Sequence, residues 1–324
     1  MKVVVPVAGV GTRLRPHTYS QPKPLLHVAG RPIIDHILEP VVRLNPEEVI
    51  FVIGFMGDQI EEYIRGHYSF PCRFVSQDHL LGLGYALNLA LEQIAGGSIL
   101  IVLGDTIVDA DLRAFVSAGP NVLGLRQVDD PSRFGIAEIK DGRIVGLVEK
   151  PDKPKSSLAV IGLYYFNDGT PLKSALAQHV KSDKKTRGEV QFTDALEMMI
   201  RNGTTFVPYE VQNWYDCGKK ETLLETNRHL LDGMKTVPAG ERCVINPPVH
   251  IAPTARVTNS VLGPYVSVSE GASISNAIIR NSIIGENATV ENVILEDSLV
   301  GSRTVVRGQR RILNVGECSE ITQD

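Results

Sequence analysis

Hydrophobic residues in the first two thirds of the chain follow two alternating patterns. Short runs rich in valine and isoleucine, which are typical of buried strands, occur at residues 3–7, 49–53, 73–75, 99–103 and 121–125. Segments with apolar residues at helical spacing lie between these runs, as at residues 33–44 and 85–94. Such an alternation of strands and helices predicts an α/β domain with a mostly parallel sheet.

One pair of segments departs from this pattern. Residues 136–140 and 143–148 each alternate apolar and polar side chains, and Asp141-Gly142 lies between them. An Asp-Gly pair favours the two-residue turn of an antiparallel hairpin, because both positions of that turn need positive φ. We therefore expect a mixed sheet.

The domain boundary is expected after a last helical pattern at residues 219–234. Segments containing proline and glycine follow at residues 237–240 and 246–248, and such segments commonly separate domains. The interpretation gives a first domain at residues 1–235 and a second at residues 245–310.

Aliphatic residues in the second domain recur at six-residue steps. Three rows, each displaced by sixteen residues from the one before, contain Leu262, Val268 and Ile274, then Ile278, Ile284 and Val290, then Ile294, Val300 and Val306. A repeat of this size indicates stacked coils, and one inward aliphatic residue per six resembles the hexapeptide left-handed parallel β-helix. An antiparallel sandwich would instead alternate with period two. We predict about three coils, with these rows pointing inward.

Composition and charge narrow the class of protein. Of the 324 residues, 43% are hydrophobic and 22% are charged, and no apolar run approaches the roughly 18 residues that span a bilayer. A net charge of −4 lacks the basic excess of proteins that bind nucleic acid non-specifically. Widely spaced cysteines without a CxxC pair argue against a zinc site or a disulfide framework; they are Cys72, Cys217, Cys243 and Cys318. We expect a cytoplasmic protein with small-molecule partners, and neither nucleic acid nor membrane as a partner.

A glycine-rich segment follows the first predicted strand. Residues 8–16 read Ala-Gly-Val-Gly-Thr-Arg-Leu-Arg-Pro, and Lys23 follows between two prolines. Backbone N–H groups of such a turn can approach phosphate oxygens, while Arg13, Arg15 and Lys23 would offset the phosphate charge. The dinucleotide fingerprint GxGxxG fails because Leu14 occupies the place of the third glycine, and no Walker sequence is present. The segment is predicted to bind phosphate in another way.

These residues resemble the signature of sugar-1-phosphate nucleotidyltransferases, the pyrophosphorylases that make nucleotide sugars. The resemblance spans the first domain and continues through Gln77, Gly82-Leu83-Gly84, Leu103-Gly104-Asp105, Phe134-Gly135-Ile136, Glu149-Lys150-Pro151, Gly162, Gly188-Glu189 and Trp214-Tyr215-Asp216-Cys217-Gly218. It implies a Rossmann-like mixed-sheet catalytic domain. The family often appends a left-handed β-helix, so the two predicted domains agree with each other.

Within the family the chain is most similar to glucose-1-phosphate thymidylyltransferases and uridylyltransferases. Two positions differ: Thr106 follows Asp105 where the thymidylyltransferases typically have asparagine, and Phe134-Gly135-Ile136 replaces Tyr-Gly-Val. These departures leave the reaction class intact but leave the sugar and the base open.

The resemblance implies transfer of a nucleotidyl group from an NTP to a hexose 1-phosphate, with release of pyrophosphate. It favours dTTP or UTP and glucose 1-phosphate, with Mg²⁺ as the cofactor. The expected catalytic residues are Arg13, Lys23 and Asp105, and the expected metal ligands are Asp105 and Asp216. The expected nucleotide-binding residues are Ala8, Gly9, Gly11, Thr12, Arg13, Gln77 and Gly82. The expected sugar-phosphate-binding residues are Gly135, Glu149, Lys150 and Gly162.

Residue type alone supports these roles unevenly. The guanidinium of Arg13 matches phosphate geometry and stays ionised. Gln77 offers the donor and acceptor that a pyrimidine edge needs, but a loop glutamine at the surface is an equally good interpretation. A lone aspartate after a strand, such as Asp105, is more often a turn residue. Lys150 would be a solvated surface lysine in most sequences, so its role depends on the resemblance.

Two alternatives belong to other classes of function or substrate. One is a non-catalytic regulatory paralogue that binds a nucleotide sugar, and the other is a pyrophosphorylase for GTP and mannose 1-phosphate. A non-catalytic paralogue would be expected to lose Arg13, Lys23 or one of the aspartates Asp105 and Asp216, and this chain retains all four. Catalysis is therefore favoured. The β-helix is expected to serve assembly, which predicts a homo-oligomer.

Overall fold

A computed structural model describes residues 1–182, 185–234 and 242–308. These residues form two compact units. The first combines Met1–Leu26 with Arg31–Thr226, and the second combines His27–Gly30 with the chain from Asn227 onward. The domain boundary predicted between residues 235 and 245 falls largely outside the described residues and stays a prediction.

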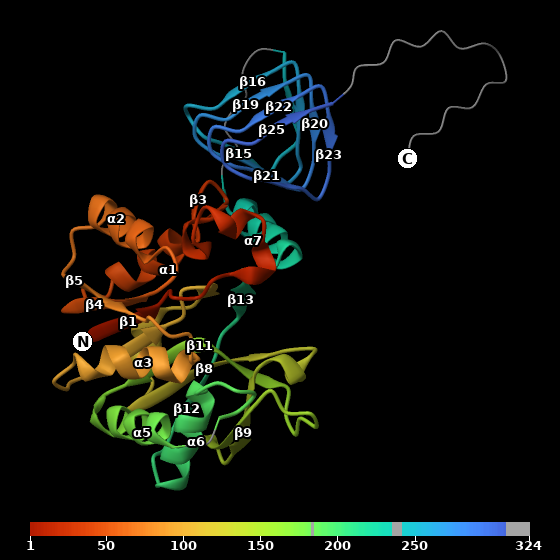
Figure 1. Ribbon diagram of the computed structural model, residues 1–324. Coiled ribbons are helices and arrows are strands. Elements are labelled where there is room, and N and C mark those ends of the chain that lie inside the picture. The colour runs from red at the N-terminus through yellow and green to blue at the C-terminus, as the bar shows by residue number, and fades with distance from the viewer. Residues whose placement is uncertain (183–184, 235–241, 309–324) are drawn as a thin grey trace. The chain divides into compact units, whose positions relative to one another are not determined.

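The first unit is built on a mixed sheet of nine strands (Figure 1). Its main path has the order β10-β9-β11-β6-β1-β4-β5, while β8 pairs with β11 and β12 pairs with β8. The parallel strands at its centre are β1 (Lys2–Pro6), β4 (Glu48–Ile53), β5 (Cys72–Ser76) and β6 (Ile99–Val102). The antiparallel neighbour β11 (Leu158–Phe166) lies between β6 and β8 (Asn121–Gln127), and β12 (Val207–Glu210) runs parallel to β8. The prediction of a mixed α/β sheet is confirmed.

The predicted hairpin is formed by β9 (Gly135–Lys140) and β10 (Arg143–Glu149). Asp141 and Gly142 have φ of 51° and 73°, the left-handed values that a type I′ turn requires at both positions. The antiparallel register places Glu149 opposite Gly135. The turn chemistry thus brings together two residues that the sequence keeps well apart.

Helices cover both faces of this sheet (Figure 1). Alternate strand residues point to opposite faces, so Val4, Ile50 and Ile101 share one core with Leu87 and Leu91. On the side of that core lie α3 (Leu83–Glu92), α5 (Thr170–Lys181) and α6 (Phe192–Arg201); the opposite face carries α1 (Ile33–Val42) and α2 (Gly57–His67). Among the described residues, no helix combines the length and apolar character needed to cross a membrane.

Short elements complete the first unit. The strands β7 (Thr106–Asp109) and β13 (Asn213–Asp216) pair with each other in antiparallel fashion, apart from the main sheet. The remaining elements of this unit are β3 (Arg31–Pro32), α4 (Leu112–Ser117), and the 3₁₀ turns η1 (Thr12–Leu14), η2 (His17–Tyr19), η3 (Lys23–Leu25) and η4 (Pro131–Arg133). The strand β2 (His27–Val28) belongs to the second unit, and α7 (Lys220–Asp232) begins in the first unit and ends in the second. Of these, η1, η3, β7 and β13 position the functional site.

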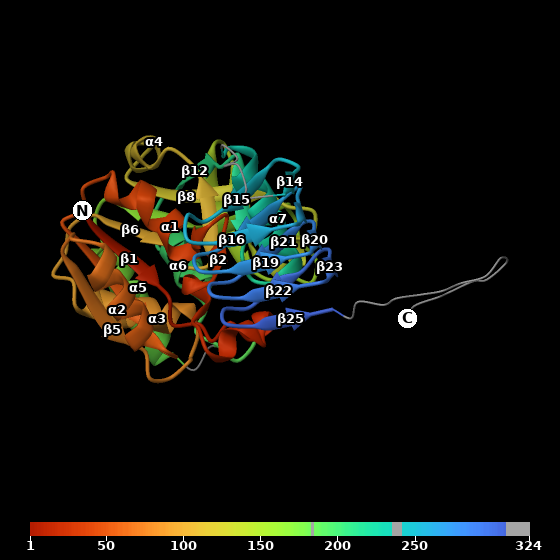
Figure 2. The same cartoon turned by 90° about the horizontal axis from the view of Figure 1, so that it is seen from above.

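The second unit contains a left-handed β-helix, as predicted, and Figure 2 shows its strands stacked one above another. Three parallel sheets have four strands each. The first sheet comprises β14 (Val244–Ile245), β17 (Val261–Leu262), β20 (Ile278–Ile279) and β23 (Ile294–Leu295). The second sheet comprises β15 (Val249–Ile251), β18 (Val266–Val268), β21 (Ser282–Ile284) and β24 (Leu299–Val300). The third sheet comprises β16 (Arg256–Thr258), β19 (Ser273–Ser275), β22 (Thr289–Glu291) and β25 (Val305–Arg307).

The expected number of coils was too low. Each sheet has four strands, so the described residues form four coils and not about three. The additional coil runs through Ile245, Ile251 and Val257, which pack in the β-helix core. Its six-residue spacing was obscured because Pro247 and Pro248 lie within it and suggested a linker.

Two of the residues predicted to point inward point outward. Ile278 is 38% exposed and Ile294 is 74% exposed, whereas Ile279 is fully buried. The strand register aligns Leu262 with Ile279 and Leu295 as the inward column. The six-residue spacing did not identify the inward residue here, because both residues of each two-residue strand in the first sheet are aliphatic. The step from Leu262 to its partner Ile279 is also one residue longer than the step from Ile279 to Leu295.

Candidate active site

A pocket of about 520 Å³ lies in the first unit, at the carboxyl ends of β1 and β6. Open α/β sheets bind ligands at this edge because the turns after the strands present backbone and side-chain groups there. The structure brings together, in the lining of this one pocket, all the residues expected to bind nucleotide, namely Ala8, Gly9, Gly11, Thr12, Arg13, Gln77 and Gly82. The expected catalytic residues Lys23 and Asp105 line it as well.

The glycine-rich segment folds as a tight turn into η1. Gly11 has a φ of 68°, and its carbonyl accepts a hydrogen bond of 2.9 Å from the hydroxyl of Thr18. Leu14, which excluded the dinucleotide fingerprint, is 2% exposed and anchors the turn in the core. Arg13 consequently faces the pocket. Arg15 does not join the pocket lining, because its guanidinium lies 4.9 Å from the centre of the Tyr19 ring.

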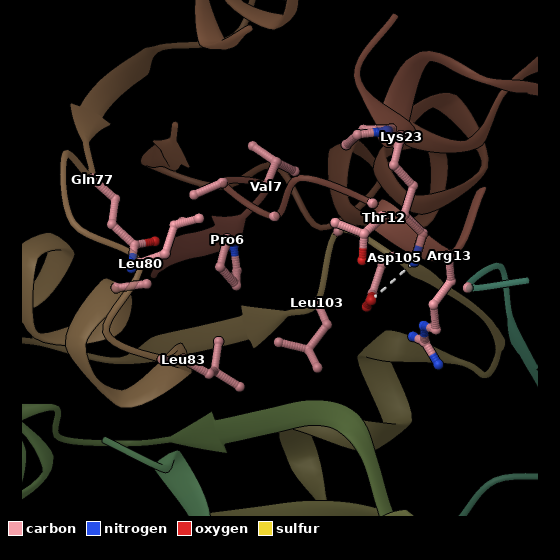
Figure 3. A pocket seen from close by; sticks show the side chains of 18 of the residues that line it. Pro6, Val7, Thr12, Arg13, Lys23, Gln77, Leu80, Leu83, Leu103 and Asp105 are labelled. Atoms are coloured by element: carbon pink, nitrogen blue, oxygen red, sulfur yellow. Dashed lines mark hydrogen bonds and ion pairs between the residues drawn. The ribbon is translucent and has the colours of Figure 1, made fainter. Parts of the chain in front are cut away.

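Lys23 and Asp105 form an ion pair inside the pocket (Figure 3). Lys23 Nζ lies 3.0 Å from Asp105 Oδ2, and the lysine side chain is 7% exposed while that of the aspartate is 45% exposed. A lysine this deeply buried needs a partner for its charge. The carboxylate of Asp105 supplies that partner and stays accessible from the pocket.

The strand pair β7 and β13 brings Asp216 to the same place. Its register sets Asp216 opposite Thr106, and the N–H of Cys217 donates to the carbonyl of Asp105 over 3.1 Å. A methyl group added to Gly218 would lie 2.7 Å from both Arg13 Nη2 and Asp216 Oδ1. The guanidinium and the second carboxylate therefore both lie against this glycine, which itself lines the pocket.

The donor set at this junction fits a divalent cation of the magnesium type. Asp105 and Asp216 offer carboxylate oxygens, which Mg²⁺ prefers, and Mg²⁺ normally takes its other ligands from water and phosphate. Among the described residues no cluster of three or more His, Cys, Asp or Glu forms a closed cage. The hydroxyl of Thr106 is buried there and has no hydrogen-bond partner in the described part of the chain, so it could pair with an ion-bound water.

The opposite end of the pocket is less charged. Figure 3 shows Gln77 and Leu80 at this end, away from Arg13, Lys23 and Asp105. Gln77 is 6% exposed, and its amide N–H donates to the carbonyl of His79 over 3.1 Å, which fixes the side chain. The amide group retains a second N–H and an oxygen lone pair for a ligand.

Gly82 narrows this end of the pocket. It has a φ of 107°, and a methyl group on it would lie 2.7 Å from the carbonyl oxygen of Val190. The chain segment after residue 186 therefore approaches the pocket closely, and Glu189 lines it. The geometry suits a flat ligand ring held between close backbone segments.

The residues expected to bind the sugar phosphate form a second group. Glu149 Oε2 accepts a hydrogen bond of 2.7 Å from the hydroxyl of Thr193, and Lys150 Nζ lies 3.4 Å from Glu149 Oε1. Gly135 lies beside Glu149, since a methyl group on it would be 3.1 Å from Glu149 Oε2. Lys150 adopts a φ of 43°, a conformation that costs energy in a non-glycine residue and is concentrated at functional sites.

These residues, with Gly162 and Asp216, are outside the set that lines the 520 Å³ pocket. Gly162 acts through a neighbour: it has a φ of 84°, and a methyl group on it would lie 2.8 Å from side-chain atoms of Leu103. Leu103 itself lines the pocket. The glycine thus makes room for a lining residue.

The hydroxyl of Tyr164 is influenced by carboxylates of both groups, and the sequence did not indicate this. Its side chain is buried in β11, and burial raises the pKa of its hydroxyl, with further increases from the negative charges of Glu149 and Asp105. Both carboxylates therefore act on one phenol. The sequence gives no signal for this role, because Tyr164 lies in a continuous apolar strand. Thr193 was missed for a similar reason, as an ordinary residue of α6.

Comparisons with known proteins agree with this geometry. The family model described as nucleotidyl transferase matches residues 2–233, and the one described as GlmU-like, C-terminal hexapeptide matches residues 239–310. A glucose-1-phosphate thymidylyltransferase of Streptomyces antibioticus is 31% identical over 342 residues, covering 100% of this chain and 94% of the relative. A protein of the same name from Streptomyces griseus is 31% identical over 314 residues, covering 88% and 87%.

A solved structure shows the same fold. UDP-glucose pyrophosphorylase complexed with UDP-glucose superposes with a TM-score of 0.63 at 22% identity, covering 72% of this chain and 99% of that one. The match to the first family model extends over most of the chain, and the match to Streptomyces antibioticus extends over all of it. This chain therefore belongs to the nucleotidyl transferase family and carries a GlmU-like hexapeptide domain after its nucleotidyl transferase domain.

Proposed function

We propose that this protein transfers a nucleotidyl group from dTTP or UTP to glucose 1-phosphate, giving the nucleotide sugar and pyrophosphate. The observation that carries the proposal is the pocket itself, which sets Arg13, Lys23 and Asp105 at one end and Gln77 at the other. A nucleoside triphosphate has the same polarity, with a charged end and a flat base. The two Streptomyces relatives, named as glucose-1-phosphate thymidylyltransferases, support this choice of substrates.

The bond changes are a substitution at phosphorus. An oxygen of the sugar 1-phosphate attacks the α-phosphorus of the NTP, and the bond from that phosphorus to the bridging oxygen of pyrophosphate breaks. In such reactions the protein contributes mainly alignment and charge neutralisation. Arg13 would bind the triphosphate and the charge that develops in the transition state, because a guanidinium matches phosphate oxygens and stays ionised.

Lys23 would hold a phosphate while remaining close to Asp105, its ion-pair partner. Asp105 and Asp216 would hold Mg²⁺, which neutralises phosphate charge when bound. Asp105 would also orient Lys23 toward the reacting phosphates. Gly218 would leave room for both Arg13 and Asp216, because both side chains lie against it.

Glu149 and Lys150 would bind the sugar 1-phosphate from the other side. Glu149 is held by Thr193 and can accept hydrogen bonds from sugar hydroxyls. Lys150, held at its backbone by a hydrogen bond of 2.9 Å to Phe134 O, offers its ammonium to the phosphate. Each substrate thus has its own set of residues. The chain would work as a homo-oligomer assembled through its β-helix.

The test is a pyrophosphate-release panel that crosses dTTP, UTP, GTP, ATP and CTP with the 1-phosphates of glucose, galactose, mannose and N-acetylglucosamine. The proposal expects the highest kcat/KM for glucose 1-phosphate with dTTP or UTP. A preference for GTP with mannose 1-phosphate would show that the proposed substrates are wrong but that the nucleotidyl transfer reaction is right. Binding of nucleotide sugar without pyrophosphate release from any pair would identify a non-catalytic paralogue.

A further inference from the structure

The ion pair between Lys23 and Asp105 leaves the two expected metal ligands in different states. Lys23 Nζ lies 3.0 Å from Asp105 Oδ2, so one oxygen of this carboxylate already pairs with a cation. Asp216 has no ion-pair partner within the described part of the chain. One expected ligand is therefore engaged by a lysine, and the other is available.

The charge of Lys23 depends on Asp105. The lysine side chain is 7% exposed, and among the described residues no second carboxylate lies within 4 Å of its ammonium. A buried ammonium without a partner is costly, so this lysine needs an anion at all times. The turn η3, which carries the lysine, is closed by two backbone hydrogen bonds of 2.9 and 3.0 Å. The lysine is therefore held at the pocket and must find its anion there.

The stem of Lys23 lies against the glycine-rich turn. A methyl group on Gly11 would be 3.2 Å from Lys23 Cβ, and Gly11 and Thr12 line the pocket together with the lysine. Figure 3 shows Thr12 and Arg13 beside the Lys23–Asp105 pair. A phosphate bound by this turn would lie within reach of the ammonium, so it can replace Asp105 as the anion of the lysine.

Without phosphate, a divalent ion on Asp105 would lie next to the ammonium of Lys23. Like charges at such short range repel, and a partly buried pocket screens the repulsion less than bulk water does. The ion and the ammonium would also compete for one carboxylate. A phosphate removes both penalties, because it gives the ammonium another partner and adds negative charge beside the ion. Binding of the ion and binding of the phosphate are therefore coupled.

We propose that Lys23 keeps the divalent ion out of the phosphate-free pocket, so that the ion and the triphosphate enter it together. Lys23 is the counter-ion of Asp105 until phosphate arrives, and then changes partner. The inference rests on the proposed metal site at Asp105 and Asp216, and it adds the order in which the charges assemble. Lys23 thus has two opposite effects: it favours the nucleotide and opposes the free ion.

The test measures binding of each partner to the full chain separately. Mn²⁺ is the probe for the metal site, and its free concentration is measured by electron paramagnetic resonance in buffer without phosphate. Binding of UTP and of dTTP is measured by equilibrium dialysis in EDTA. Lys23→Met should bind Mn²⁺ alone at least about tenfold more tightly than the wild type, and the nucleotide at least about tenfold more weakly. A distorted turn would instead weaken both.

Two further variants control for charge and for the loss of a lysine. Lys23→Arg keeps the positive charge, so it should bind Mn²⁺ alone as weakly as the wild type. Lys2→Met is the matched control, because Lys2 also pairs with a carboxylate, that of Glu47 at 3.6 Å, but lies at the amino end of β1, outside the pocket lining. It should change neither affinity. Since the Asp105 side chain is 45% exposed, water can solvate it in Lys23→Met, whose circular dichroism should match that of the wild type.

The double variant Lys23→Met/Asp105→Asn separates failure of this inference from failure of the metal site. It should lose the gain in Mn²⁺ affinity, because the ion then lacks its carboxylate. If it binds Mn²⁺ as tightly as Lys23→Met does, the proposed metal site is wrong and this inference falls with it. If Asp105→Asn abolishes Mn²⁺ binding but Lys23→Met does not increase it, the metal site stands and Lys23 does not oppose the ion. An equal increase in Lys23→Arg would also overturn the proposal, since the charge would then play no part.

Discussion

Lys23 Nζ lies 3.0 Å from Asp105 Oδ2, although 82 positions separate the two residues in the sequence. The lysine comes from η3 after the glycine-rich turn, and the aspartate follows β6. Because β1 and β6 are parallel neighbours, the segments that follow them leave the sheet at the same edge. The ion pair is therefore a direct consequence of the strand order, and it joins the expected phosphate-binding turn to an expected metal ligand.

Removing one carboxylate should greatly reduce turnover. We expect Asp105→Asn and Asp216→Asn each to lower kcat by on the order of 10²-fold or more at saturating Mg²⁺, because each loses charge that would hold the ion on the reacting phosphates. The measurement is steady-state pyrophosphate release. Asp109→Asn is the control, since Asp109 lies on β7 as well but is exposed at its far end. Near-normal turnover of both site variants would exclude the metal assignment.

A methyl group at Gly218 should separate two functional side chains. We expect Gly218→Ala to lower kcat/KM at least about tenfold, because the new methyl would lie 2.7 Å from both Arg13 Nη2 and Asp216 Oδ1 and must push one of them away. Gly66→Ala is the control, because a methyl there has nothing within 4 Å and the helical position tolerates alanine. If Gly218→Ala has the kinetics of the wild type, Arg13 and Asp216 do not need this arrangement.

The two substrates should respond to different residues. Lys150→Ala should raise KM for the sugar 1-phosphate by more than about tenfold, since a charge-assisted contact to phosphate is worth about 1.5–3 kcal/mol. Gln77→Ala should mainly raise KM for the nucleotide, by a smaller factor, because the lost contact is neutral. Kinetics that vary each substrate in turn will measure both effects. Equal shifts of both constants in both variants would show that the two half-sites are misassigned.

Cys217 should be chemically inert in the folded protein. Burial raises the pKa of its thiol to about 12, and the thiol also lies 3.8 Å from the hydroxyl of Thr226. The reactive thiolate is therefore almost absent at pH 8, and alkylation should become appreciable only as the pH approaches that pKa or the protein unfolds. Iodoacetamide labelling followed by peptide mass mapping will report each cysteine separately. Rapid labelling of Cys217 at pH 8 without unfolding would contradict its placement.

Much of the fold follows from local patterns in the sequence. The five predicted strand runs, the helices at residues 33–44 and 85–94 and the hairpin at Asp141-Gly142 all appear in the structure with small shifts of their ends. These features depend on side-chain periodicity and on the φ preferences of a few residues, which a single sequence displays. The glycine-rich turn could be recognised for the same reason.

Other features depend on how distant segments are placed. The six-residue count could not tell Ile278 from Ile279, because both are aliphatic and only pairing with the neighbouring coils decides which one faces the core. Likewise, nothing in an apolar strand marks Tyr164 as the phenol on which Glu149 and Asp105 both act.

The sequence by itself determined which chemical groups the chain carries and which segments become strands, helices and turns, because these depend on residues close together in the chain. Only the tertiary structure decided that Arg13, Lys23 and Asp105 lie at one end of a pocket and Gln77 at the other. It also decided that Asp216 and Arg13 both lie against Gly218, and that Ile278 is exposed while Ile279 is buried. The physical reason is that burial and charge interactions depend on distances in space, which strand order and register set and which local periodicity does not contain.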